Sequence, residues 1–266
     1  MIEQRLFMDE KIPNDNDISG DGSTSPERNQ ATLVRDSERK RSSVAPIETA
    51  ILPRKRIVTS SQRGTKIDEK LLTLELYNSF NYSVLPDDQR QLGYSIGVTS
   101  ANRAEGKTTA ACNFALSLSV GSRRRTVLVD MNLQRPRLHD IFGIPLGPGI
   151  VDALIGDEVF VTPSSVENLF VLPAGKAVGK KISLAHLSAF KDIVESLLRE
   201  YEILIFDLPS LDTSDFPTVF CNQLNGLLIV TEVGKTRRRD IERVFRKVHS
   251  NQILGFIMNR VDDKRL

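Results

Sequence analysis

The sequence has few of the features that mark secreted, disulfide-stabilised or membrane-embedded proteins. It contains two cysteines and no tryptophan in 266 residues. Cys112 and Cys221 make no disulfide framework, and both lie in apolar patterned segments, which predicts two buried thiols. No stretch approaches the roughly 18 consecutive apolar residues of a membrane-spanning helix, and the first residues lack the apolar centre of a signal peptide. We therefore expect a cytoplasmic protein.

An excess of charge of one sign is also lacking. The chain has 36 Lys and Arg against 34 Asp and Glu, which gives a net charge of +2. Because positive and negative charges are nearly equal in number, composition gives no reason to expect a nucleic acid or an acidic membrane as partner. We expect no specific nucleic-acid binding. His139, His186 and His249 are scattered without the spacing of metal ligands, so we assign them no metal.

The first 66 residues differ in composition from the rest. They are rich in Asn, Asp, Ser, Gly, Pro, Arg and Lys and show no sustained periodicity. Such a segment cannot bury enough apolar surface to offset the entropy of ordering. We predict a largely disordered polar tail over 1–66 and one folded domain over 67–266. The basic pieces at 39–41 and 54–56 are interpreted either as solvated linker or as contacts to phosphates or anionic lipid.

From residue 67 onward, short apolar runs alternate with amphipathic segments. The runs, which are typical of buried strands, are 94–99, 126–130, 169–172, 203–207, 226–231 and 253–259. Apolar residues at helical spacing predict helices at 70–82, 108–119, 184–200 and 237–249. Strands that are apolar on both faces and alternate with helices form mainly parallel sheets. The predicted fold class is α/β, with helices on both faces of a mainly parallel sheet.

A loop with the sequence ANRAEGKTT, residues 101–109, lies between the first of these strands and the next helix. It resembles the phosphate-binding loop G-x-x-x-x-G-K-[ST], with Ala101 in place of the first glycine. In such a loop the lysine faces the β and γ phosphates and the hydroxyl ligates Mg²⁺. Its position between strand and helix favours this interpretation over a chance surface turn. We predict a P-loop NTPase that binds ATP and Mg²⁺ through Ala104, Glu105, Gly106, Lys107, Thr108 and Thr109.

Two of the predicted strands end in an aspartate, Asp130 and Asp207. In open α/β sheets, the carboxyl ends of the strands face the crevice that binds ligands. Asp130 is interpreted as an acid that orients a Mg²⁺-bound water or accepts a proton, or else as a cap of the following turn. Asp207 is interpreted as the acid that supports Mg²⁺. The predicted metal site is Thr108, Asp130 and Asp207, and the predicted catalytic residues are Lys107, Asp130 and Asp207.

Two further segments allow more than one interpretation. Asn259 ends the last predicted strand, where its carboxamide either contacts a purine edge or forms a turn. Arg237, Arg238 and Arg239 begin the last predicted helix, as a solvated face or as a docking patch.

The order of these motifs resembles the cytoplasmic domain of the bacterial tyrosine kinases (BY-kinases) that regulate capsular and exopolysaccharide synthesis. The resemblance covers about residues 70–264 and is most specific in TVLVDMNLQRPRLHDIFGIPLGPGIVDALIG, where Arg135-Pro136 and Gly149 fall where the family places them. The wider group of P-loop ATPases includes chromosome-partitioning and division-site ATPases. That group usually has a second lysine five residues before the P-loop lysine. Asn102 stands at that place here, which favours the polysaccharide branch.

The resemblance also implies roles for single residues. Lys107 and Thr108 hold ATP and Mg²⁺, and Asn259 lies near the adenine. Asp130 is the first acid of the motif called Walker A′, and Asp207 is the acid of Walker B.

The sequence departs from the family at three positions of the site. Asn132 replaces the second Walker A′ acid, Ala104 replaces a glycine, and Ser210 replaces a proline. No tyrosine cluster stands near the last residues, so we do not expect autophosphorylation of a tail. The segment KLLTLELYNSF lacks the arginine of the helix that helps such kinases form rings, so homo-oligomerisation is left open.

These observations predict a kinase-like ATPase that regulates capsular or exopolysaccharide biosynthesis or export. We expect a membrane chain-length or export protein as its partner, which would hold it peripherally at the inner membrane. A catalytically weak, nucleotide-dependent scaffold of the export complex is the first alternative, favoured by Asn132 and Ala104. A partitioning or positioning ATPase is the second, and Asn102 argues against it.

Overall fold

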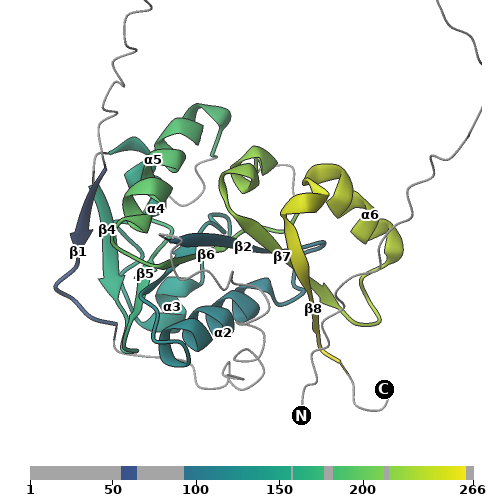
Figure 1. The fold of residues 1–266 in the computed structure, drawn as a ribbon, viewed down its shortest axis with the longest axis horizontal. Coiled ribbons are helices and arrows are strands. Elements are labelled where there is room, and N and C mark those ends of the chain that lie inside the picture. The colour runs from purple at the N-terminus through teal and green to yellow at the C-terminus, as the bar shows by residue number, and fades with distance from the viewer. Residues whose placement is uncertain (1–54, 65–92, 157, 177–181, 213–215, 262–266) are drawn as a thin grey trace, which may run out of the picture. The chain divides into compact units, whose positions relative to one another are not determined.

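The computed structural model describes residues 55–64, 93–156, 158–176, 182–212 and 216–261, which all belong to one compact unit of the chain (Figure 1). The strands are β1 (Arg56–Thr59), β2 (Tyr94–Ser100), β3 (Thr126–Asp130), β4 (Glu158–Pro163), β5 (Leu169–Leu172), β6 (Ile203–Asp207), β7 (Gly226–Glu232) and β8 (Ile253–Asn259). The α-helices are α2 (Lys107–Val120), α3 (Leu138–Phe142), α4 (Ile150–Ile155), α5 (Leu187–Leu198) and α6 (Arg238–Lys247). Short 3₁₀ helices are η2 (Leu184–His186), η3 (Thr218–Gln223) and η4 (Ser250–Gln252).

These strands form one sheet in the order β1-β4-β5-β3-β6-β2-β7-β8. Neighbours are parallel throughout, except that β4 and β5 are antiparallel. Because β3, β6 and β2 are adjacent and parallel, their carboxyl ends meet at one edge of the sheet. The loop after β2 and the aspartates that end β3 and β6 are therefore neighbours. The predicted fold class is confirmed.

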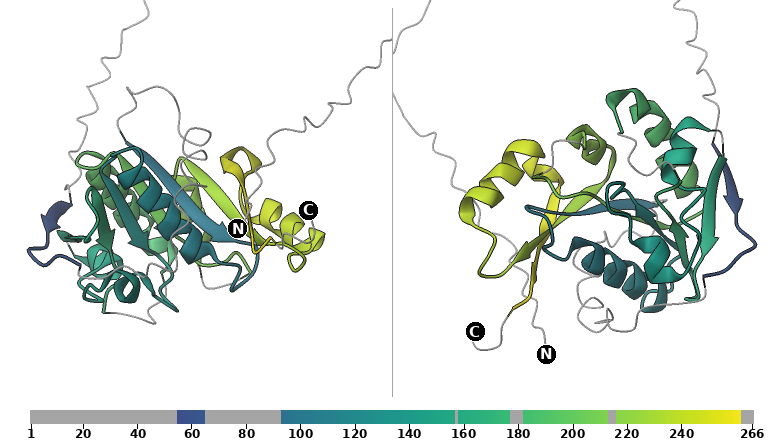
Figure 2. Two further views of the ribbon diagram at one scale, coloured as in Figure 1. Left: turned by 90° about the horizontal axis from the view of Figure 1, so that it is seen from below. Right: turned by 180° about the vertical axis from the view of Figure 1, so that it is seen from behind.

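Helices cover both faces of this sheet. On one face, Val98, Leu128 and Ile205 belong to an apolar cluster that also holds residues of α2 and α3. On the other face, Val129 and Phe206 belong to a second cluster with residues of α4, α5 and α6. The ribbon views place α2 and α3 on one side of the sheet and the other helices opposite (Figures 1 and 2). Successive strand residues thus alternate between two dry cores, which explains why the strands read as continuous apolar runs.

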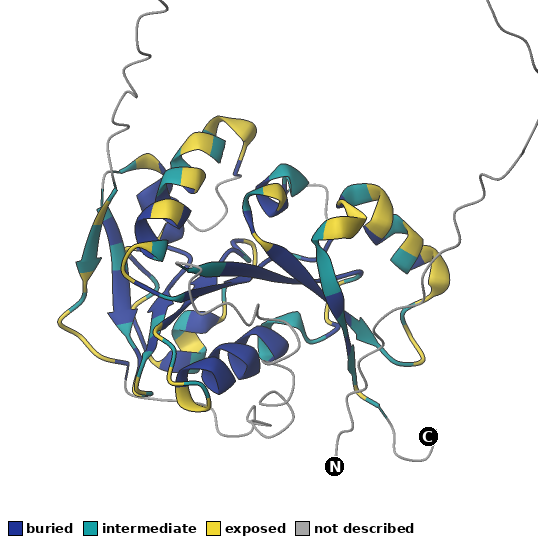
Figure 3. Cartoon of the chain, in the orientation of Figure 1, coloured by how far each residue is buried: buried dark blue, intermediate teal, exposed yellow. Residues whose placement is uncertain are grey.

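Burial follows the predicted pattern along the chain. The strands expected at 126–130, 169–172, 203–207 and 253–259 have those bounds, and β3 and β6 in the middle of the sheet are buried along their whole length (Figure 3). The small side chains of α2 let it lie close against the sheet, with residues 110–119 all buried. Cys112 and Cys221 are buried free thiols, as predicted. Among the described residues, no helix is both long and apolar enough to cross a bilayer.

The sheet extends further at one edge than the sequence predicted. β4 and the edge strand β1 had no predicted counterpart, and β1 lies inside the segment assigned to the tail, 1–66. Arg56–Thr59 pairs in parallel with β4, and Ile57 packs against the core. A four-residue strand beside basic residues is too short for a periodic signal. The boundary at 66 is therefore corrected; residues 1–54 and the helix predicted at 70–82 lie outside the described residues.

Candidate functional site

The loop between β2 and α2 has the backbone geometry of a phosphate-binding loop. Gly106 precedes the first residue of α2 with a left-handed φ of 94°, and a Cβ there would collide with the Asn259 amide. The free N–H groups of the first turn of α2 therefore open toward the loop, which favours an anion at that point. Ala104 also has a left-handed φ, 64°. That conformation suits glycine, which explains why related loops have a glycine there.

Lys107, Thr108 and Asp207 meet beside this loop. The Thr108 hydroxyl donates a hydrogen bond to Asp207 Oδ2 at 2.7 Å, and Lys107 Nζ lies 3.7 Å from Asp207 Oδ1. Asp207 is completely buried, and burial raises the pKa of its carboxyl while Lys107 and Thr108 oppose that shift. The sequence predicted these three residues as one site, and the structure brings them together.

Asp130 lies next to Asp207 in the register of β3 and β6 but is held differently. Its Oδ1 accepts the backbone N–H of Asn132 at 3.1 Å, and its Oδ2 accepts those of Arg137 and Leu138 at 3.0 and 3.1 Å. Burial and then the neighbouring Asp207 raise the pKa of Asp130 to about 7, although the three N–H groups lower it. Asp130 thus organises the loop after β3, as the capping interpretation required.

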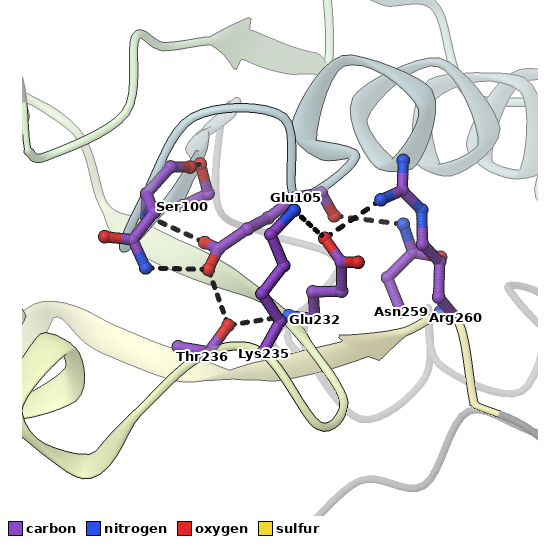
Figure 4. A network of polar contacts seen from close by, with 8 residues as sticks. Ser100, Glu105, Glu232, Lys235, Thr236, Asn259 and Arg260 are labelled. Carbon is purple, nitrogen blue, oxygen red and sulfur yellow. Dashed lines mark hydrogen bonds and ion pairs between the residues drawn. The ribbon is translucent and has the colours of Figure 1, made fainter.

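The Glu105 side chain is buried and points toward the segment that contains Thr236 (Figure 4). Its carboxylate accepts the backbone N–H and the side-chain amide of Asn102, at 2.8 and 3.0 Å. It also accepts the hydroxyl of Thr236 at 2.5 Å, from the segment between β7 and α6. Asn259 donates its side-chain N–H to the Glu105 carbonyl at 3.0 Å. Both predicted binding residues therefore hold the loop, and any contact of theirs with a nucleotide stays a prediction.

A cavity of about 310 Å³ opens in front of the loop. The predicted residues that line it are Ala104, Gly106, Lys107, Thr108 and Thr109. The sequence analysis did not assign the arginines that join them: Arg103, Arg135, Arg137 and Arg260. Among the described residues, no acidic side chain lines this cavity, so the described lining is strongly cationic. The arginines are distributed over three loops, and only the fold reveals that they converge, although Arg135 already stood in the most specific motif.

The cavity suits a nucleoside triphosphate with Mg²⁺. Asp207 Oδ1 is buried and has no hydrogen-bond partner within the described part of the chain, as expected for an atom that awaits a ligand. Those same residues contain no cluster of three or more His, Cys, Asp or Glu side chains that could enclose a metal. Mg²⁺ in nucleotide sites typically has one or two protein ligands, phosphate oxygens and waters. Thr108 and Asp207 lie together at the cavity, Asp130 ends the adjacent strand, and a metal site formed by these three residues stays a prediction.

The sequence is similar to those of several bacterial tyrosine kinases. No protein-family model matches the sequence. The chain is 24% identical over 172 residues to the putative tyrosine-protein kinase CapB of Staphylococcus aureus, covering 63% of this chain and 75% of CapB. It is 28% identical over 199 residues to the succinoglycan biosynthesis transport protein ExoP of Rhizobium meliloti, covering 71% of this chain and 25% of ExoP. The chain is a divergent relative of the bacterial tyrosine kinases.

A solved structure supports the same relation at the level of the fold. The chimerical protein CapA2B2 superposes with a TM-score of 0.63 at 20% identity, over 75% of this chain and 94% of that chain. This likeness agrees with the predicted fold, a mainly parallel sheet with helices on both faces. The sequence relation to the BY-kinases is likewise confirmed.

Proposed function

We propose that this chain binds MgATP in the cationic cavity and acts as a tyrosine-kinase-like ATPase in capsular or exopolysaccharide biosynthesis or export. The observation that carries the proposal is the meeting of Lys107, Thr108 and Asp207 at a cavity lined by four arginines. The names of CapB and ExoP support the reaction class and the pathway.

The cationic groups have a direct role in this proposal. A triphosphate carries several negative charges, and Lys107 with the arginines can neutralise them in a cavity without acids. Thr108 and Asp207 would hold the Mg²⁺ that accompanies the nucleotide, and that ion would supply positive charge to the phosphates. Asp207 is placed to orient Thr108, and through it that ion, while Lys107 faces the transferred group.

The partner and location follow from the pathway. We infer that a membrane chain-length or export protein binds this chain and holds it peripherally at the inner membrane. The succinoglycan transport protein ExoP supports that inference, since a segment of it is similar to this chain. Homo-oligomerisation stays a prediction.

Calorimetry with MgATP tests the site. Lys107→Ala should weaken binding about a hundredfold or more, because it removes a charge-assisted contact to the phosphates. The matched control is Lys191→Ala, which removes an exposed lysine on α5 and should leave the affinity for MgATP unchanged. Equal affinity of the Lys107→Ala variant and the parent would show that the nucleotide site lies elsewhere.

One feature favours a scaffold that binds nucleotide without turning it over. Asn132 stands where the family has a second acid, and its amide donates to the Arg135 carbonyl at 3.1 Å. The Asp130 carboxylate is already occupied by three N–H groups. Radiolabelled ATP decides between the two: phosphate release or phosphoprotein above the Lys107→Ala background supports the enzyme, and neither, with ATP still bound, supports the scaffold.

A further inference from the structure

The exposed face of α6 is a dense group of basic side chains. Arg238 and Arg239 on the first turn and Arg246 on the last are exposed, and Arg243 lies between them half-buried. Val244 and Asp240 are buried on the opposite face, so the helix sits on the core with its arginines outward. In a chain with a net charge of only +2, this concentration on one helix is a local property.

Internal ion pairs account for only part of this charge. Arg238 pairs with Glu242 at 3.1 Å, and Arg243 pairs with Asp240 at 2.8 Å. For Arg239 and Arg246 the described residues provide no acidic partner within ion-pair distance. Arg239 and Arg246 therefore present two exposed guanidinium groups, about two turns apart on one face of the helix, that form no ion pair within the described part of the chain.

An aromatic side chain lies on the same exposed part of the helix. Phe245 precedes Arg246 and is 47% exposed, a large apolar surface for a residue outside the core. The Phe245 ring packs against the ring of Phe256 in β8, with the two ring centroids 6.1 Å apart, and this contact restricts the position of the Phe245 side chain. A fixed aromatic ring among arginines is the side-chain combination of helices that lie in the headgroup region of membranes.

The start of α6 is connected to the phosphate-binding loop. Thr236 directly precedes the arginines, and its hydroxyl bonds Glu105 inside that loop while accepting the backbone N–H of Glu232 at 2.8 Å (Figure 4). Glu232 in turn pairs with Lys235 at 3.1 Å and with Arg260 at 2.9 Å, and Arg260 lines the cavity. One network of hydrogen bonds and ion pairs therefore joins the phosphate-binding loop to the segment that precedes α6.

We propose that α6 docks on the headgroups of an anionic phospholipid surface through Arg239, Arg246 and Phe245, and that Thr236 links this docking to the nucleotide loop. The docking is independent of the proposed function, whereas the link rests on it. An acidic protein segment would also meet the arginines, but it gives no reason for the exposed phenylalanine, and a lipid surface does. This contact is to the lipid itself and adds to any contact through a protein partner.

Vesicle co-sedimentation of the full chain tests the docking. The parent should bind phosphatidylcholine vesicles that contain phosphatidylglycerol, and not phosphatidylcholine alone. Arg239→Glu/Arg246→Glu should lower the partition constant by about tenfold or more, since each basic residue near an anionic surface contributes several-fold. The matched control is Lys191→Glu/Arg199→Glu, the same change of charge on exposed residues at α5, which should stay within about twofold of the parent.

Three outcomes overturn the docking. The first is that the parent binds no vesicles, and the second is that an acidic peptide displaces it from them. The third is equal binding of the α6 variant and the parent, which would move the contact to the basic segments at 39–41 and 54–56. If Arg239→Glu/Arg246→Glu fails to fold, as its thermal midpoint will show, Arg246→Gln takes its place with a smaller expected loss, about threefold.

Adding MgATP tests the link. The parent's partition constant should shift by about threefold or more, and Thr236→Val, which removes the hydroxyl bonded to Glu105, should abolish the shift. Calorimetry on the same samples separates the failures. A parent that binds MgATP without a shift refutes the link, and a parent that binds no MgATP refutes the proposed function and leaves the docking standing.

Discussion

Two of the loops that line the cavity are each organised by one buried carboxylate, but the two carboxylates bind partners at different distances along the chain. Asp130 accepts backbone N–H groups only from its own loop, residues 132–138. Glu105 accepts Asn102 of its own loop and also Thr236, from a segment 131 residues away. The loop after β3 is thus a local structure, and the phosphate loop depends on the other half of the sheet.

Asp207 belongs to neither loop, and this separates it from Asp130. Both end adjacent strands in register and both are fully buried. Asp130 has its oxygens filled by backbone donors, whereas Asp207 keeps one oxygen without a hydrogen bond in the described residues and faces Thr108 and Lys107. Equal positions at the end of two strands therefore serve different purposes: Asp130 holds the loop after β3, and Asp207 holds Thr108 and Lys107, which line the cavity.

The largest expected effect is that of pH on the ligand-free chain. The pKa of Asp130 is raised from 3.8 to about 7, so between these values the folded chain holds a proton that the unfolded chain has lost. The free energy of unfolding should therefore fall as pH rises from 4.5 to 7.5, by on the order of 2–4 kcal/mol. Urea titrations across that range measure it. A slope that persists unchanged in Asp130→Asn would assign the proton elsewhere, Asp207 being the first candidate because its pKa is raised too.

Substitution of the loop-organising acid should cost stability. Asp130→Ala leaves three backbone N–H groups of the loop after β3 without their acceptor. We expect the free energy of unfolding to fall by about 3 kcal/mol, and by less at a pH where the substitution also removes a buried charge. Urea unfolding at pH 5 measures this loss under conditions where the Asp130 carboxyl is protonated and uncharged. Asp207→Ala is the comparison, because it breaks one hydroxyl bond and should cost about 1 kcal/mol or less. Equal losses in the two variants would erase the distinction between the aspartates.

For nucleotide affinity, in contrast to stability, substitution of Asp207 should have a larger effect than substitution of Asp130. Asp207→Asn keeps the size of the side chain but removes the charge behind Thr108, and we expect MgATP binding to weaken about 10–100-fold. ATP without Mg²⁺ should be affected much less, which calorimetry in EDTA can check. If the loss is the same with and without the metal, Asp207 supports the phosphate loop and has no part in holding Mg²⁺.

The contrast between the loops also explains what the sequence could predict. The central strands and α2 were predicted correctly from apolar runs and one local motif. Lys107, Thr108 and Asp207 lie together in the structure, and their roles at a nucleotide stay predictions. The capping role of Asp130 was one of two stated interpretations, because a strand-end acid and its own loop are close in sequence. The link between Thr236 and Glu105 and the convergence of four arginines depend on the order of strands in the sheet, to which no local pattern is sensitive.

The strand β1 was missed for a related reason. Arg56–Thr59 is four residues long and lies beside basic residues, so its composition predicts a polar tail. It is ordered by the partner strand β4 and by an ion pair of Arg56 with Glu158 at 3.3 Å, 102 residues further along the chain. An edge strand of this kind takes its stability from the sheet that it joins.

The smallest expected effect concerns strain in the phosphate loop. Ala104 has a φ of 64°, which costs a residue with a Cβ roughly 1–2 kcal/mol. Ala104→Gly removes that cost but adds freedom to the unfolded chain, so we expect a net gain in stability of about 0.5 kcal/mol. Ala189→Gly, the same change inside α5, should destabilise by about 1 kcal/mol. If both variants lose stability equally, Ala104 is unstrained, and the phosphate loop would be as relaxed as the loop that Asp130 organises.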